Sequence, residues 1–265
     1  MQADWLKTLP IQGPVQVEPL YEGVANQVFR LQASTDTYVL KVFCHDHPYG
    51  LNREQEVSLQ RQLAAQGMAP SVLHFDAARG LLLQPFIHEP DLKRAPIADS
   101  DRIRQVAETL TRIHTVQVDA PLWSLRERID TYLAALMDFD RDAATQIRKK
   151  FKPLQRQLDC WSAHPVFCHN DLALHHIFAT RPCLVIDWEY AGFGERLFDL
   201  ANCILINRYS RSDAQSLVNA YEGFSGLTLA RDQLDAWLQV ASCVNELWYE
   251  LHHQLQRQAA ATDNG

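Results

Sequence analysis

Two acidic residues near the middle of the chain constrain its fold more than any other feature. Asp171 lies two residues after His169, and Asp187 directly follows the apolar run 184–186, sixteen residues later (187 − 171). Phosphoryl transfer from ATP needs one carboxylate that orients and deprotonates an attacking hydroxyl and a second that holds a divalent cation on the phosphates. The spacing therefore predicts a fold that brings these two carboxylates together. In it Asp171 acts on the hydroxyl, His169 braces the loop and Asp187 binds the metal.

One position departs from the protein-kinase pattern. That catalytic loop runs H-x-D-x-x-x-x-N, with Asn five residues after the Asp. Here the corresponding position (171 + 5) is His176. Histidine is a softer ligand than Asn and is less natural for Mg²⁺. Three hypotheses stay open: His176 binds metal through a ring nitrogen, Asp187 binds it with water and phosphate alone, or the site is catalytically weak.

The pattern of apolar residues changes near residues 84–90. The first third is rich in β-branched and aromatic residues, which is typical of strands, and later segments have helical spacing. The expected strands are 15–20, 27–32, 38–43, 72–75 and 81–86, and the expected helices are 53–66, 99–114, 125–137, 147–161, 213–224 and 231–255. We expect an α+β, two-lobed fold: residues 1–87 form a nucleotide-binding lobe, and residues 88–265 form a helical lobe with the catalytic loop and the substrate site. Ligands bind in clefts between such lobes.

The charge and the cysteines limit the partners and the compartment. The net charge of −7 argues against nucleic acid, whose phosphates need a basic surface, and suits a cationic small molecule. We expect no membrane span and no signal peptide, since no long apolar run is present. The six cysteines include no C-x-x-C pair, which predicts reduced thiols in a cytoplasmic protein. The sequence does not predict the oligomeric state.

A lysine inside an apolar strand is a candidate phosphate contact. Lys41 lies within residues 38–43, where an unpaired ammonium is costly to bury. Glu56 on the following helix can pair with it and fix its position, as the strand lysine and helix glutamate do in kinases, and Glu54 is the alternative partner. The structural alternative is a lysine on the solvent face of an edge strand.

The turn at residues 22–27 is a candidate nucleotide loop. It contains Gly23 and Asn26, and a glycine there lets backbone N–H groups approach phosphate oxygens. It has one glycine where a G-x-G-x-x-G loop has three, so an ordinary turn is the alternative.

Aromatic and acidic residues late in the chain are candidates for the substrate site. Trp188 and Glu189 follow Asp187, and Trp248 and Tyr249 lie beside further carboxylates. Aromatic faces combined with carboxylates can hold an organic cation. Packing in the core is the alternative, because aromatic residues at helical spacing are more often buried.

With these residues placed, the chain resembles the aminoglycoside phosphotransferase and choline kinase superfamily over nearly its whole length. Residues 168–172, Cys-His-Asn-Asp-Leu, match the choline kinase version of the catalytic loop. Residues 186–192, Ile-Asp-Trp-Glu-Tyr-Ala-Gly, are similar to the choline, ethanolamine and thiamine kinase branch. The resemblance implies a protein-kinase-like fold, ATP and Mg²⁺ as cofactors, and a small hydroxylated, often cationic substrate.

The resemblance also assigns further residues. It implies that Gln84, Phe86 and Ile87 form the hinge that binds adenine, and that Asp199 is a structural residue of the helical lobe. We therefore expect an ATP-dependent kinase that phosphorylates the hydroxyl of a small metabolite of the choline, ethanolamine or thiamine type. The alternatives are a non-catalytic nucleotide- or metabolite-binding pseudokinase, motivated by His176, and an aminoglycoside or sugar kinase.

Overall fold

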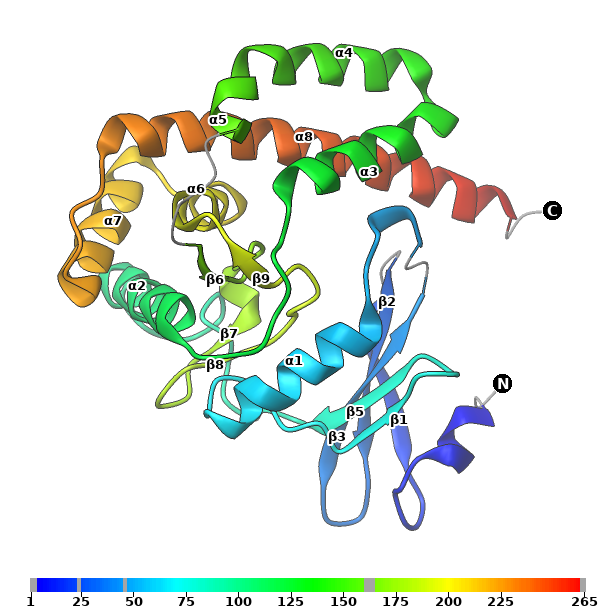
Figure 1. The fold of residues 1–265 in the computed structure, drawn as a ribbon. Coiled ribbons are helices and arrows are strands. Elements are labelled where there is room, and N and C mark those ends of the chain that lie inside the picture. Colours follow the sequence, from blue (N-terminus) through cyan, green and yellow to red (C-terminus); the bar gives the residue numbers. More distant parts are fainter. Residues whose placement is uncertain (1–3, 23–24, 45–46, 160–164, 263–265) are drawn as a thin grey trace.

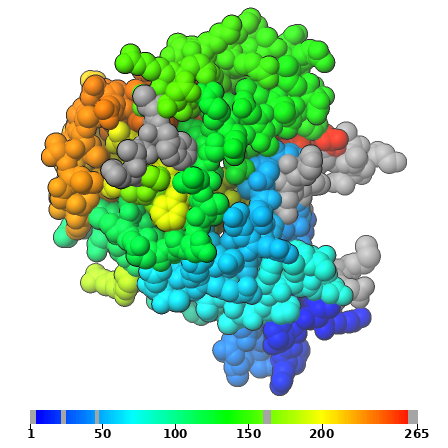
Figure 2. All heavy atoms as spheres, in the orientation of Figure 1, coloured from blue at the N-terminus to red at the C-terminus, as the bar shows by residue number. Residues whose placement is uncertain are grey.

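A five-stranded sheet and a larger group of helices make up the computed structural model, which describes residues 4–22, 25–44, 47–159 and 165–262 (Figure 1). We call residues 16–85 the sheet part and residues 99–262 the helical part. In the space-filling view the two parts are in contact along a broad boundary, blue to cyan against green to red (Figure 2). The predicted α+β fold class is confirmed, and the predicted division between residues 87 and 88 stays a prediction.

The sheet is antiparallel throughout and has the order β1-β2-β3-β5-β4. Its strands are β1 (Gln16–Glu22), β2 (Asn26–Gln32), β3 (Thr37–Phe43), β4 (His74–Asp76) and β5 (Leu81–Pro85). Successive side chains of a strand point to opposite faces. In β3 this places Leu40 in a small core with Leu31 and Leu83, while Lys41 points to the opposite face.

Helix α1 (Arg53–Ala65) crosses the sheet on that opposite face (Figure 1). Asn52 caps its first turn, because the Asn52 side chain accepts a hydrogen bond from the Gln55 N–H. Gly67 follows the helix with a φ of +67°, a conformation that glycine adopts at little cost. The predicted helix and its glycine stop are therefore confirmed.

Seven further helices and four short strands form the helical part. The helices are α2 (Asp99–Thr115), α3 (Leu125–Phe139), α4 (Arg141–Phe151), α5 (Gln155–Asp159), α6 (Arg196–Ile206), α7 (Arg211–Ser225) and α8 (Arg231–Thr262), and the strands are β6 (Val166–Cys168), β7 (Ile177–Phe178), β8 (Leu184–Val185) and β9 (Gly192–Gly194). Strands β6 and β9 pair, as do β7 and β8, and so bracket the catalytic loop. No helix formed by the described residues combines the length and the apolar character needed to cross a membrane.

The structure differs from the predicted elements in two main places. The single helix expected at 147–161 is wrong: α4 begins at Arg141, capped by Asp140, and a 3-10 turn containing Pro153 separates it from α5. Helix α6 was not predicted, because eight consecutive residues of it, 197–204, are buried. A helix that is buried all round has no polar face to reveal its period.

Candidate active site

The catalytic loop after β6 is held by one buried carboxylate, that of Asp199 on α6. Asp199 Oδ2 accepts the His169 N–H at 3.0 Å, and Oδ1 accepts the Asn170 N–H at 2.7 Å. Asn170 has a φ of +63°, a conformation that Asn tolerates better than most residues. Asp199 therefore fixes the backbone of the loop without using the side chain of Asp171.

A second set of hydrogen bonds holds Asp199 itself. His114 Nε2 lies 3.0 Å from Asp199 Oδ2, and His114 Nδ1 lies 2.7 Å from the Tyr221 hydroxyl. Arg196 Nη1 donates to the same hydroxyl at 2.5 Å. Burial opposes ionisation of Asp199, but the hydrogen bond and charge of His114 lower its pKa overall. We call Asp199, His114, Tyr221 and Arg196 the Asp199 network.

The carboxylate of Asp171 accepts no hydrogen bond from the residues that the structure describes, although it is at least half-buried. Burial raises its pKa well above the usual range, and the negative charges of Asp187, Glu189 and Asp199 raise it further. A carboxylate with a raised pKa and free oxygens is suited to accepting a proton from a substrate.

Lys41 lies at the centre of a group of carboxylates. Its Nζ is 2.7 Å from Asp187 Oδ1, 3.0 Å from Glu56 Oε1 and 3.8 Å from Glu189 Oε2. Burial alone would lower its pKa, but these three negative charges raise it, so the ammonium stays charged. The predicted pairing with Glu56 is present, while Glu54 is exposed.

Arg53 is a second cation of this group, and the sequence reasoning missed it. Its Nη1 lies 2.6 Å from Glu56 Oε2 and 2.8 Å from Glu189 Oε2, and its Nη2 donates to Asn26 Oδ1 at 3.0 Å. Its position three residues before Glu56, on the same face of the helix, was a signal that could have found it. We call Lys41, Arg53, Glu56, Asp187 and Glu189 the charged cluster.

His176 lies close to the carboxylates of Asp171 and Asp187. Its Nδ1 lies 2.8 Å from the backbone oxygen of Asp171, and because a carbonyl only accepts, this nitrogen carries the proton. Its Nε2 lies 3.5 Å from Asp187 Oδ2. Ligand atoms of Asp171, His176 and Asp187 all lie within 4.8 Å of one another. This donor set fits a divalent cation, with one nitrogen among oxygens.

His169 has the bracing position that the sequence predicts. Its Nε2 donates to the Ile186 carbonyl at 3.1 Å, and its Nδ1 accepts the Asp171 N–H at 3.3 Å. Burial above all lowers its pKa to about 4, so the ring is neutral near pH 7.

Asp187 and Glu189 both face Lys41, although neither lies in a strand. Strand β8 ends at Val185, and Asp187 has a φ of +69°. Although burial raises its pKa, the charge of Lys41 above all holds the pKa of Asp187 well below the usual range. Asp187 is therefore ionised and ready to bind a cation.

The predicted substrate residues lie in different surroundings. Trp188 is only 1% exposed and donates its Nε1 to the Val185 carbonyl, so its contact with a substrate stays a prediction that its burial does not support. Trp248 donates its Nε1 to the Tyr190 hydroxyl at 3.3 Å, and Tyr249 is exposed beside it. Tyr190, which directly follows Glu189, is buried.

The predicted nucleotide contacts stay predictions. Gln84 Oε1 accepts a hydrogen bond from Gln60, and the Phe86 N–H donates to the Thr37 carbonyl at 3.0 Å. Ile87 is partly buried, and Asn26 Nδ2 donates to Glu189 Oε2 at 3.3 Å. Gly23 lies outside the described residues.

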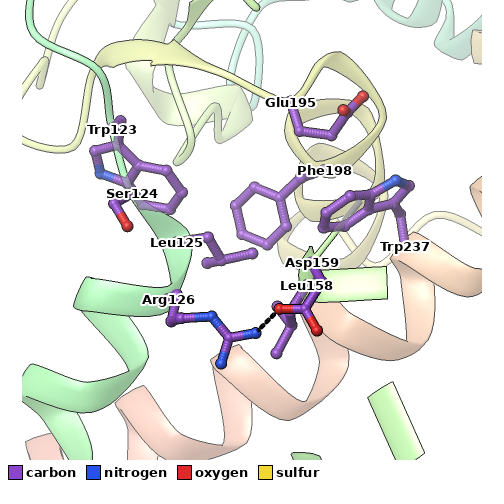
Figure 3. Close-up of a pocket in the computed structure, with 9 residues that line it drawn as sticks. All are labelled: Trp123, Ser124, Leu125, Arg126, Leu158, Asp159, Glu195, Phe198 and Trp237. Carbon is purple, nitrogen blue, oxygen red and sulfur yellow. Dashed lines mark hydrogen bonds and ion pairs between the residues drawn. The ribbon is translucent and has the colours of Figure 1, made fainter. Parts of the chain in front are cut away.

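A separate cavity of about 240 Å³ lies between α3, α5, α6 and α8 (Figure 3). The rings of Trp123, Phe198 and Trp237 line it, and an ion pair between Arg126 and Asp159 lies at one side. It contains none of the predicted site residues, so we assign it no part in the site.

Comparison with known proteins gives concordant results in sequence and structure. The model of the "Phosphotransferase enzyme family" matches residues 16–238. Ethanolamine kinase 2 of Mus musculus is 26% identical over 212 residues, which cover 71% of this chain and 52% of that protein. The chain spans 52%, 59% and 60% of the length of three curated relatives it matches.

Two solved structures of LicA are similar over most of both chains. The choline kinase LicA from Streptococcus pneumoniae has a TM-score of 0.75 at 18% identity, covering 96% of this chain and 89% of that one. A structure of LicA in complex with AMP has a TM-score of 0.73 at 19% identity, covering 94% and 88%. These likenesses confirm the predicted kinase-like fold.

Proposed function

The chain belongs to the phosphotransferase enzyme family, and we propose that it transfers the γ-phosphoryl group of ATP to the hydroxyl of a small cationic metabolite of the choline, ethanolamine or thiamine type. One observation carries the proposal: ligand atoms of Asp171, Asp187 and His176 lie within 4.8 Å of one another, and Asp187 forms an ion pair with Lys41. The names of the similar proteins, an ethanolamine kinase and a choline kinase, support the class of acceptor.

Asp171 would position the acceptor hydroxyl and take its proton as the oxygen attacks phosphorus. A positioned base of this kind contributes about 10²–10⁴-fold to a rate. The loop is pre-positioned, because Asp199 binds the N–H groups of the two residues that precede Asp171. The protein therefore supplies geometry before the substrate arrives.

Lys41 would contact the phosphates, and Glu56 would keep its ammonium in place. The oxygens of Asp187 are divided between two partners, since Oδ1 faces Lys41 and Oδ2 faces His176 Nε2. Asp187 and His176 would hold a divalent cation, which supplies charge neutralisation on the phosphoryl group when bound. The adenine contact of Gln84, Phe86 and Ile87 remains part of the proposal.

An ADP-release assay over a panel of alcohols tests this function. The panel contains choline, ethanolamine, thiamine, an aminoglycoside and a neutral sugar, each with Mg²⁺ and with Mn²⁺. We expect ADP and a phosphorylated product, identified by mass spectrometry, with at least one of the three cationic metabolites. AMP and ATP binding without turnover of any alcohol would favour the pseudokinase, and turnover of the aminoglycoside or sugar alone would reject the acceptor class.

The five described cysteines are free thiols, which supports the predicted cytoplasmic location.

A further inference from the structure

Four aromatic side chains form a group that we call the tyrosine box: Tyr49, Tyr132, Tyr190 and Trp248. The rings of Tyr49 and Trp248 stack at 6.0 Å, and those of Tyr49 and Tyr132 meet edge to face at 6.2 Å. The Trp248 Nε1–H donates to the hydroxyl of Tyr190 at 3.3 Å. The four residues come from the segment after β3, from α3, from the segment after β8 and from α8, so the fold rather than the local sequence assembles them.

The tyrosine box is joined to the loop of the proposed catalytic carboxylate, because the Asn170 side chain donates to the Tyr190 carbonyl at 2.9 Å. Burial above all raises the pKa of Tyr132 to about 12; the charge of Arg128 opposes this rise, and the charges of Glu189 and Asp171 add to it. The same two carboxylates add to the raised pKa of Tyr190, again after burial. An acceptor with its hydroxyl at Asp171 would therefore extend its other end toward these rings.

A cation of the chain itself occupies the faces of two of these rings. The Cζ of Arg128, on α3, lies 5.6 Å from the centre of the Tyr190 ring and 5.9 Å from the centre of the Tyr132 ring. Two tyrosine faces within about 6 Å of one cation are the arrangement by which aromatic side chains recognise ammonium ligands. The position that suits an organic cation is thus filled from within the chain.

Arg128 is held in that position by backbone oxygens. Its Nη1 donates to the carbonyls of Tyr49 and Gly50. Gly50 has a φ of +62°, a conformation that glycine adopts at little cost. No carboxylate among the described residues forms an ion pair with Arg128, in contrast to Arg53, which has two.

We propose that Arg128 is an internal competitor of the substrate: it occupies the tyrosine faces that bind the cationic end of the acceptor, and it leaves them when the acceptor binds. The proposal rests on the proposed function for the direction in which the acceptor lies. Two cations on the same ring faces repel each other, so the acceptor and Arg128 exclude one another there. Arg128 thereby sets the affinity for the acceptor and favours cations that bind strongly enough to displace it.

The test measures binding of tetramethylammonium chloride to the full chain, by calorimetry at constant ionic strength. Arg128→Met removes the charge and keeps a side chain of similar length, and we expect the Kd for tetramethylammonium to fall about tenfold. Arg128→Lys keeps a cation near the rings and should change the Kd less than about threefold. Arg126→Met is the matched control: it lies two residues away on α3 and pairs with Asp159, so it should leave the Kd unchanged.

An unchanged or higher Kd in Arg128→Met overturns the proposal. AMP affinity and Tm show whether each variant is folded. A measurement on the unsubstituted protein covers the case of an unfolded variant: saturating tetramethylammonium should shift the Arg128 side-chain Nε–H resonance away from its ring-shifted position. No shift of that resonance would also overturn the proposal.

The outcomes separate this inference from the proposed function. If Arg128→Met binds tetramethylammonium more tightly and no alcohol is phosphorylated, the inference stands and the proposed function fails. If a cationic alcohol is phosphorylated and its KM is the same with Met or Arg at residue 128, the proposed function stands and the inference fails.

Discussion

The Asp199 network and the charged cluster flank the same catalytic loop but differ in how their charges are balanced. In the Asp199 network a single carboxylate, 0% exposed, receives two backbone N–H groups and faces His114. The charged cluster holds three carboxylates and two cations, a net charge of −1 (2 − 3), or −2 when Asp171 is counted as ionised. One divalent cation would neutralise the charge of −2.

The Asp187 and Asp199 side chains also differ in their exposure to solvent. The Asp187 side chain is 26% exposed and can be reached by a cation or a phosphate, whereas Asp199 cannot. One region is complete as folded and keeps the loop rigid, and the other is incomplete without a ligand. Buried, fully bonded polar groups stabilise a fold, while partly satisfied clusters are where ligands bind.

The largest expected effect concerns Asp171, which lies beside the charged cluster. Asp171→Asn removes the proposed base and keeps the shape, so kcat should fall about 10³-fold while the Kd for AMP changes less than about threefold. A coupled ADP assay and calorimetry measure the two quantities. Asp138→Asn, an exposed aspartate on α3, is the control and should retain full turnover. Equal turnover in Asp171→Asn and the parent protein would remove Asp171 from the mechanism.

The same variant should be more stable than the parent protein at neutral pH. Asp171 has a folded-state pKa raised above the ordinary value of an aspartate, so its ionisation opposes folding and the penalty grows as pH rises above that ordinary value. Asp171→Asn should therefore raise Tm at pH 8, by about 2–4 °C for each kcal/mol gained, and the gain should shrink toward pH 4. A constant gain across this range would contradict the link to ionisation.

The second effect concerns the Asp199 network. Asp199→Asn replaces one acceptor oxygen by an amide that donates, so a donor then faces the donors of residues 169 and 170 or of His114. We expect a loss of about 2–4 kcal/mol in the free energy of unfolding, measured by urea denaturation. A loss below 0.5 kcal/mol, as we expect for Asp138→Asn, would show that the network does not anchor the loop.

A smaller effect concerns the metal preference of the charged side. An imidazole nitrogen favours Mn²⁺ over Mg²⁺ relative to an amide oxygen. His176→Asn should therefore lower the ratio of Mn²⁺ to Mg²⁺ affinity about tenfold, within the range for the loss of a favourable ligand contact. Electron paramagnetic resonance of bound Mn²⁺ measures this without turnover. His175→Asn is the matched control, since its exposed ring is adjacent but lies outside the donor set. The same ratio in both variants would exclude His176 as a ligand.

The smallest effect is a shift in the pH dependence of kcat/KM. Activity requires ionised Asp171 and should fall as pH drops through its raised pKa. The charge of Glu189 contributes to that rise, after burial and Asp187. Glu189→Gln should therefore move the acidic limb of the profile to lower pH. A shift to higher pH would show that Glu189 acts mainly by holding Arg53 and Lys41.

The sequence predicted the parts of the site that local motifs determine. The spacing of His169, Asp171 and Asp187, and the apolar strand around Lys41, placed four residues that the structure brings together. The sequence did not predict Arg128, because its contacts depend on which distant rings it meets, whereas Arg53 was missed although its spacing to Glu56 is a local signal. Helix α6 was missed for the related reason that burial on every side erases the periodicity that marks a helix.

The hydrogen bonds between Asp199 and the catalytic loop have a consequence for which side chains of the loop can change. Its carboxylate contacts the loop only through the N–H groups of residues 169 and 170, which every residue except proline supplies. These hydrogen bonds therefore do not depend on which side chains follow in the loop. In a chain built this way, histidine can replace asparagine at residue 176 and change the metal or substrate that binds, while the loop keeps its fold.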